Sequence, residues 1–280
     1  MKTTTLEKHS CLSSCSERRR LIQGAAALAF LGIGAHGTAK AVMGVDLIGA
    51  FAANTFVESI EALGGAPLSS SLIKIDAPSI AENGASVPIT VSSTLPGAIE
   101  ILLLVDSNPK PVAAWFTVPA GTTAFVSTRI RMAGNGTLYV VIRTDDGGLY
   151  AATHAIEVTV GGCGFEDEGV TVEPMLASAA RIRATLDNNG AATVRVLMPH
   201  PMESGMRSDK AGKLLPAYYI TDFIVTLAER LVFSARLSIA VSTNPLIAFR
   251  VVGARVGQRL RVVWKDTRGD SRSSESIVIT

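Results

Sequence analysis

One cysteine lies between glycines near the middle of the chain, in the sequence TVGGCGFEDEG of residues 159–169. A thiolate is a good nucleophile and forms covalent bonds with sulfur atoms and sulfur oxyanions. The flanking Gly161, Gly162 and Gly164 have no side chains that would bury the thiol, and ordering them costs backbone entropy. We therefore expect Cys163 to be exposed on a flexible arm, as a point of covalent substrate attachment. The alternatives are an incidental exposed thiol or a cysteine that forms an intermolecular disulfide.

The other candidate residues form no recognisable catalytic group. His154 falls in register with the apolar face of its predicted strand, which favours a satisfied core histidine over a ligand. His200 lies between prolines in MPHPM, which indicates a stiff loop that could contact a partner. Arg129 and Arg131 are expected on one face of a strand, where they would attract an anion; simple alternation also explains them as a solvated strand face. No metal-ligand spacing, Gly-x-Ser-x-Gly motif or phosphate-binding loop is present, so we expect no metal and no cofactor.

The first 41 residues are typical of an export signal. SERRRLI, residues 16–22, has the order of a twin-arginine signal, and a short apolar run, Gly24–Gly34, follows it. AKA, residues 39–41, provides a small-x-small cleavage site. Because a membrane span needs about 20 apolar residues, a cleaved signal is favoured over a membrane anchor. We expect twin-arginine export to the periplasm and no membrane insertion after cleavage.

Removal of this leader changes both the charge and the cysteine count. The leader carries a net charge of +4, and subtracting it from the chain's +2 leaves −2 for residues 42–280. This balance does not favour nucleic acid as a partner. Cys11 and Cys15 leave with the leader, so Cys163 has no partner for an intramolecular disulfide in the mature chain.

The pattern of apolar residues predicts an all-β protein with a helix before the first strand. The helix is expected over 46–63, where apolar residues recur at helical spacing before two glycines. The predicted strands of the first half are Leu72–Ile75, Val87–Ser92, Ile99–Val105, Ala113–Val118, Ala124–Met132, Leu138–Thr144 and Tyr150–Val160. Those of the second half are Ala179–Leu186, Ala192–Met198, Ile220–Leu227, Leu231–Ile239, Leu246–Val251, Arg259–Lys265 and Ser276–Ile279. Short strands at this spacing favour two immunoglobulin-like β-sandwich domains.

Several long motifs resemble a known family. IDAPSIAENGASVPIT, SNPKPVAAWF, STRIRM and VTVGGCG are similar to SoxY, the cysteine-bearing subunit of the sulfur-oxidation carrier. MPHPMESGMRSDKAGKLLPAYYI, STNPLIAFRVVG and VVWKDTRGDS resemble SoxZ, its partner subunit. The resemblance divides the chain into a signal peptide at 1–41, a SoxY-like carrier domain at 42–164, a linker at 165–178 and a SoxZ-like domain at 179–280.

The resemblance implies a carrier that catalyses nothing itself. The cysteine at the position of Cys163 would hold pathway intermediates as covalent sulfur adducts, such as a cysteine S-thiosulfonate. Periplasmic sulfur-oxidation enzymes and c-type cytochromes would act on the cargo. A related set of fused SoxYZ-like proteins is associated with quinoprotein dehydrogenases, so a non-covalent binding module for such an enzyme is the alternative. An autonomous thiol enzyme is disfavoured because the sequence places no base beside the cysteine.

One departure from the family concerns the arm. The SoxY arm is a free C-terminus that ends in Gly-Gly-Cys-Gly-Gly, whereas here Phe165–Glu168 replaces the last glycine and the chain continues. Residues 161–169 have a contour of about 30 Å, so an arm tied at both ends would protrude by about 15 Å at most. The three acids that follow the thiol should disfavour the thiolate and repel anionic cargo, although solvent screening weakens both effects.

Overall fold

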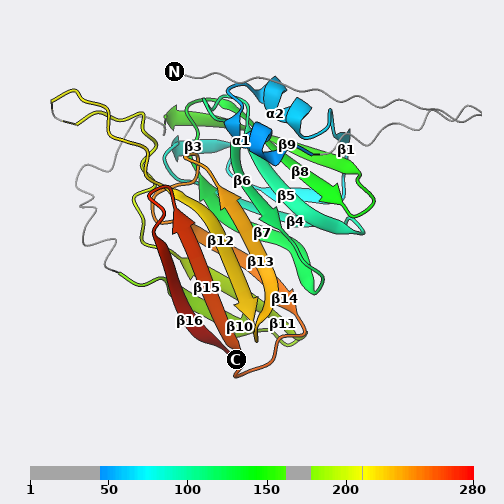
Figure 1. Cartoon of the computed structure of the whole chain (residues 1–280). Coiled ribbons are helices and arrows are strands. Elements are labelled where there is room, and N and C mark those ends of the chain that lie inside the picture. The colour runs from blue at the N-terminus through cyan, green and yellow to red at the C-terminus, as the bar shows by residue number, and fades with distance from the viewer. Residues whose placement is uncertain (1–44, 162–177, 210) are drawn as a thin grey trace, which may run out of the picture. The chain divides into compact units, whose positions relative to one another are not determined.

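The computed structural model describes residues 45–161, 178–209 and 211–280. These residues are mostly β-strand, with two short helices before the first strand (Figure 1). The expected fold class of two immunoglobulin-like sandwiches is confirmed. None of the described helices is long and apolar enough to cross a membrane. The expected leader, 1–41, and most of the expected linker, 165–178, lie outside the described residues.

The N-terminal helical segment consists of two helices, α1 (Leu47–Ala52) and α2 (Phe56–Ala62), so the prediction of a single helix was wrong. The Thr55 hydroxyl accepts a hydrogen bond from the Glu58 backbone N–H, and the Glu58 carboxylate accepts one from the Asn54 N–H. This reciprocal pattern resembles a capping box, which starts a new helix at this point. The apolar spacing did not reveal the break because both helices bury residues in one cluster.

Nine strands lie within residues 45–161, the described part of the first half. They are β1 (Leu68–Ser69), β2 (Ile73–Asp76), β3 (Ile80–Asn83), β4 (Val87–Ser93), β5 (Ala98–Val105), β6 (Val112–Thr117), β7 (Thr122–Ile130), β8 (Gly136–Thr144) and β9 (Leu149–Val160). Both strands missing from the prediction, β1 and β3, pair parallel with β9. They are too short to show an alternating pattern.

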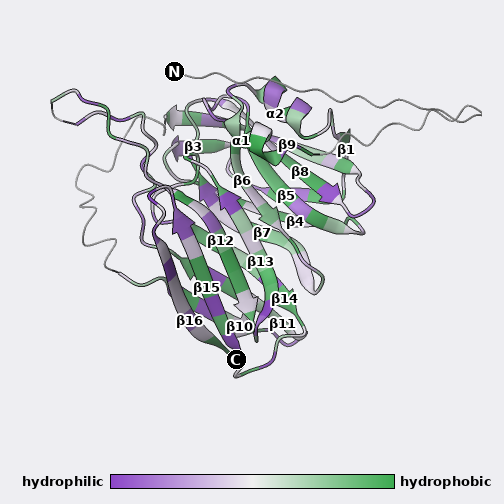
Figure 2. Ribbon diagram, viewed as in Figure 1, coloured by the Kyte–Doolittle hydropathy of each residue, from purple (hydrophilic) through white to green (hydrophobic). Residues whose placement is uncertain are grey.

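The second half contains β10 (Arg181–Leu186), β11 (Ala191–Leu197), β12 (Ile220–Leu227), β13 (Arg230–Leu237), β14 (Leu246–Val252), β15 (Arg259–Asp266) and β16 (Ser271–Ile279). Hydrophilic and hydrophobic residues alternate along strands such as β15 (Figure 2). The prediction started β16 five residues too late, at Ser276. Its first residues are serine-rich and carry no apolar signal, but they pair with β15 from Ser271 onward.

Both sheets continue across the boundary between the halves. Sheet A has the strand order β1-β9-β8-β5-β6-β13-β12-β15-β16, and its two halves join where β6 pairs antiparallel with β13. Sheet B has the order β10-β11-β14-β7-β4-β2, and its halves join where β7 pairs with β14. The parallel pairing of β16 with β10 links the two sheets at the far side of the second half.

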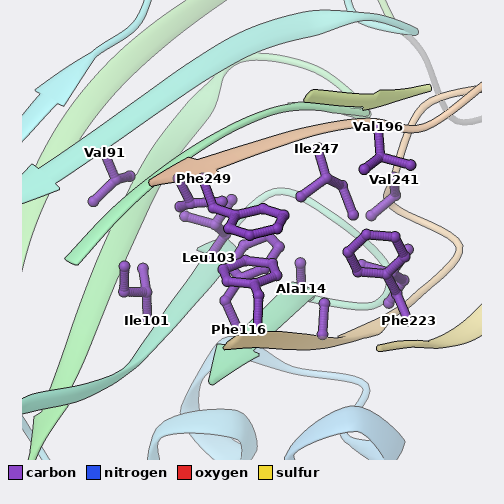
Figure 3. Packing of buried hydrophobic residues seen from close by; sticks show 14 of the residues in the cluster. Val91, Ile101, Leu103, Ala114, Phe116, Val196, Phe223, Val241, Ile247 and Phe249 are labelled. Atoms are coloured by element: carbon purple, nitrogen blue, oxygen red, sulfur yellow. The ribbon is translucent and has the colours of Figure 1, made fainter. Parts of the chain in front are cut away.

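The side chains between the sheets form one hydrophobic cluster that includes both halves. Phe116 from the first half stacks on Phe233 from the second, with ring centroids 5.8 Å apart, and Phe233 stacks on Phe249 at 4.1 Å. Figure 3 shows Phe116 and Leu103 pointing into the same interior as Phe249 and Phe223. The two domains therefore bury apolar surface in a shared core. A second, smaller cluster lies between the helices and the outer face of sheet A in the first half.

Candidate functional site

The strand β9 leads directly toward Cys163, and its end is anchored on both sides. On one side the Val158 N–H donates to the Asn135 side-chain oxygen at 2.7 Å. On the other side, β3 pairs with β9 up to Asn83 opposite Val160, and the Gly84 N–H donates to the Val160 carbonyl at 2.7 Å. The backbone position from which the glycine–cysteine segment starts is thus determined by two neighbouring segments, the loop that holds Asn135 and the segment of β3 with Gly84.

Gly161 is the one predicted arm glycine among the described residues. A Cβ at this position would lie 2.3 Å from the Ala133 carbonyl oxygen, a distance that real Cβ atoms do not adopt. Gly161 therefore allows a close backbone approach and belongs to the anchored part of the chain, so its assignment to the flexible arm was wrong. Cys163, Gly162 and Gly164 lie outside the described residues, and their roles remain predictions.

A buried asparagine organises the loop against which Gly161 packs. The Asn108 side chain donates to the Arg131 carbonyl and accepts from the Ala133 N–H, both at 2.8 Å. The adjacent Met132 N–H donates to the Gly84 carbonyl at 2.8 Å. Because Asn108 is buried and both of its polar groups are paired, the loop has little freedom to move. The sequence analysis did not predict these hydrogen bonds. Asn108 lies more than 20 positions from Arg131 and Ala133, and no residue pattern in the sequence connects them.

Arg131 was predicted to attract anions, and the structure contradicts this role. Its side chain is only 9% exposed. The guanidinium donates to the backbone carbonyls of Met202 and Ile239 and to the Thr243 hydroxyl, all in the second half of the chain. β7 ends at Ile130, so the alternation that placed Arg131 beside Arg129 does not extend to it. Arg131 instead ties the two domains together.

Arg129 is exposed on β7, as its position in the strand predicts. Its backbone carbonyl accepts a hydrogen bond from the Ser242 N–H at 3.1 Å. The structure gives this arginine side chain no ion pair among the described residues, and its role as an anion or partner contact stays a prediction.

His200 was predicted to contact a partner, but it is 1% exposed and cannot do so. Its Nδ1 accepts a hydrogen bond from the Met202 N–H at 3.1 Å, and its ring packs on Tyr218 with centroids 4.6 Å apart. Its Nε2 lies 3.8 Å from the Asp266 carboxylate, beyond hydrogen-bond distance. Burial lowers the pKa of His200 to about 4, against the opposing effect of Asp266. The flanking prolines indicated a stiff loop but not that the loop folds inward.

His154 lies half-buried on the side of β9 that also carries Ile156, which is in the core. Its Nε2 is buried and has no hydrogen-bond partner among the described residues. The predicted position is confirmed, whereas the expectation of a satisfied side chain was wrong. No group of three His, Cys, Asp or Glu side chains in the described residues is placed to hold a metal ion.

Comparison with protein families gives two matches. The sulfur oxidation protein SoxY matches residues 60–163, and the sulphur oxidation protein SoxZ matches residues 181–276. A search among curated proteins found no match.

Solved structures also resemble parts of the chain. The sulfur carrier protein SoxY from Chlorobium limicola f thiosulfatophilum is 42% identical, with a TM-score of 0.32, and the similarity covers 35% of this chain and 88% of that one. A superoxide reductase (neelaredoxin) from Ignicoccus hospitalis is 21% identical, with a TM-score of 0.28, over 31% of this chain and 79% of that one. Since the SoxY and SoxZ matches follow one another in a single polypeptide and together cover most of residues 42–280, the chain belongs to the SoxY and SoxZ families of sulfur-oxidation carriers, as a fused SoxYZ-like protein.

Proposed function

We propose that the protein is a periplasmic carrier that holds sulfur-oxidation intermediates covalently on Cys163 and presents them to partner enzymes. The observation that carries this proposal is the position of the SoxY match, which ends at residue 163, three residues beyond the end of β9. Cys163 is also the sole cysteine outside the expected leader. The twin-arginine sequence at 16–22 supports export to the periplasm.

The chemistry of attachment needs a partner. When the Cys163 thiolate joins the outer sulfur of thiosulfate, one S–S bond forms and an electron pair leaves. Because the thiol and thiosulfate together lose two electrons, the step needs an oxidant, for which periplasmic c-type cytochromes are the appropriate class. A hydrolase then adds water to the terminal sulfonate and breaks its bond to the neighbouring sulfur, so that sulfate and two protons are released and a persulfide remains on Cys163. In this scheme the carrier supplies the thiol and its placement, and the partner enzymes supply the catalysis.

The anchoring of β9 supports a carrier role. A carrier must present its thiol from a defined starting point while the thiol itself stays accessible to several enzymes. The hydrogen bonds at Val158 and Val160 and the close packing of Gly161 provide such a starting point. The segment that presents the thiol therefore begins no earlier than Gly162.

A second candidate function is a non-covalent binding module for a periplasmic quinoprotein dehydrogenase. It is favoured by Glu166, Asp167 and Glu168, which follow the cysteine closely and oppose both thiolate formation and the approach of anionic cargo. In that case the thiol is dispensable, and replacement of Cys163 leaves the phenotype unchanged.

Blocking of the thiol distinguishes the two functions. Extracts of thiosulfate-grown cells are treated with a maleimide reagent before and after reduction. The carrier function predicts that Cys163 reacts only after reduction, whereas in cells grown without sulfur compounds it reacts at once. Full reactivity under both growth conditions, together with normal growth of a Cys163→Ser strain on thiosulfate, would overturn the carrier function.

A further inference from the structure

Five arginines lie together on the outer face of sheet B. They are Arg181, Arg183, Arg195, Arg250 and Arg129, from the neighbouring strands β10, β11, β14 and β7. All five side chains are exposed. We call this set the arginine face.

The strand register places these residues in three rows. In the middle row Arg183 is opposite Arg195, which is opposite Ala248, which is opposite Ser127. Residues two positions away along each strand share the same face. The second row therefore holds Arg181, Leu197, Leu246 and Arg129. The third holds Thr185, Thr193 and Arg250, whose guanidinium lies 4.5 Å from the centroid of the Phe125 ring.

The arginine face carries no compensating negative charge. None of the eleven residues in the three rows is Asp or Glu. No ion pair involves any of the five arginines within the part of the chain that the structure describes. Asp187, in the turn between β10 and β11, uses its carboxylate to accept the backbone N–H groups of Asn189 and Ala191. The four strands of the face are thus basic in a protein whose residues 42–280 carry a net charge of −2, and the register places the next acid of the middle row, Asp76, two strands beyond Ser127.

One pair shows that this arrangement is unfavourable for the fold itself. Arg183 and Arg195 are directly opposite each other across the antiparallel pair of β10 and β11. Like charges in directly opposite positions destabilise a sheet. An arrangement that costs stability and gains no internal contact indicates an external ligand of opposite charge.

The dimensions of the face indicate a large ligand. Four strands at about 4.8 Å spacing and three rows at about 6.7 Å spacing extend over about 14 Å in each direction. A single sulfate-sized anion contacts at most two of these guanidinium groups. Guanidinium groups form paired hydrogen bonds with carboxylates, so a surface with several carboxylates can engage all five.

We propose that the arginine face is the docking surface for an acidic face, rich in Asp and Glu, of a partner protein. Few apolar side chains on this side could insert into a lipid surface: Leu197 and Leu246 are half-buried, Arg250 covers the Phe125 ring, and Val252 at the end of β14 is the exposed one. Because β7 comes from the first half and the other strands from the second, the surface exists only when the two domains are joined. The proposal does not depend on what Cys163 carries.

The test measures binding of a fluorescent poly-glutamate peptide to the full mature chain at low salt. The variant Arg183→Gln/Arg195→Gln/Arg250→Gln should weaken binding by about tenfold or more. The matched control is Arg259→Gln/Arg261→Gln/Lys265→Gln, which removes the same charge from exposed positions of β15 on the outer face of sheet A. This control should change binding by less than about threefold. Wild-type and Cys163→Ser proteins should bind equally, which separates this result from the carrier function.

Several outcomes overturn the proposal. Equal losses in the two triple variants would show a general effect of net charge. Competition by sulfate or thiosulfate beyond that of chloride at the same ionic strength would show a small-anion site. Stronger arginine-dependent binding to vesicles of anionic phospholipid than to the peptide would show a membrane surface. Thermal unfolding followed by circular dichroism confirms that each variant is folded.

Discussion

At the scale of single residues, position 161 requires a glycine because the neighbouring backbone leaves no room for a side chain. The Ala133 carbonyl occupies the position that a Cβ would need, and Ala133 is itself held by Asn108. Replacement by any other residue must therefore displace the loop or the end of β9. The structural requirement and the proposed function concern the same residue, because Gly161 is the last residue before Cys163 that the structure describes.

We predict that Gly161→Ala lowers the free energy of unfolding by about 1–3 kcal/mol, the usual cost of overpacking. The matched control is Gly134→Ala in the neighbouring loop, where a Cβ meets no atom within 4 Å and the backbone is not left-handed. Urea unfolding measures both. Equal stability of the two variants would show that the loop yields to the extra carbon and that Gly161 is not a tight contact.

His200 makes stability depend on pH. Its pKa is about 4 in the folded protein, against 6.5 for an ordinary histidine, because burial disfavours the charged ring. Below pH 6.5 the unfolded chain binds a proton at this position and the folded chain does not, so stability falls as the pH drops from 6.5 to 4. The full difference corresponds to about 3 kcal/mol.

Urea unfolding between pH 7 and pH 4 checks this effect. The variant His200→Gln removes the titrating group, so its stability should fall less steeply over the same interval. Carboxylates contribute to acid sensitivity in both proteins, which makes the difference between the two profiles the relevant quantity. Identical slopes would contradict the assignment of the effect to His200.

At the scale of the strands, the arginine face places two like charges directly opposite each other, which lowers the stability of the sheet. Arg183→Thr removes the repulsion with Arg195, and we predict a gain of about 0.2–1 kcal/mol in unfolding free energy at low salt. The gain should shrink at high salt, where the charges are screened. Arg181→Thr is the control, since Arg181 lies opposite Leu197 and not opposite a charge. A loss of stability in Arg183→Thr would mean that Arg183 has a favourable contact.

Prediction from sequence succeeded for the strands with regular alternation. β9 alternates over its whole length, and its predicted start differed by one residue from the observed one. β3 and the start of β16 were missed because short or serine-rich segments show no apolar periodicity, although they pair in the sheet. Arg131 was misplaced because alternation does not show where β7 ends. The burial of His200 depends on residues such as Tyr218 and Asp266, which no local pattern connects to it.

At the scale of the whole chain, the two domains share one core and two continuous sheets. The hydrogen bonds from Arg131 to Met202 and Ile239 add a polar tie across the same boundary. Neither half can unfold without exposing apolar surface of the other.

We therefore predict that both halves unfold in one transition. The two tryptophans report on the halves separately, since Trp115 lies in β6 and Trp264 in β15. The Trp115→Phe variant keeps only Trp264, and the Trp264→Phe variant keeps only Trp115. In each variant, the midpoint of urea unfolding followed by fluorescence should equal the midpoint followed by circular dichroism. Two separate transitions in a single variant, seen by fluorescence and by circular dichroism, would show independent domains.

The central claim is that Cys163 holds the cargo, and intact-mass spectrometry of the protein from thiosulfate-grown cells tests it most directly. The account predicts a mass increase equal to one sulfur-containing group, removed by reductant, mapped to the peptide that contains Cys163 and absent from Cys163→Ser. An unmodified Cys163 in protein from cells that are actively oxidising thiosulfate would contradict it.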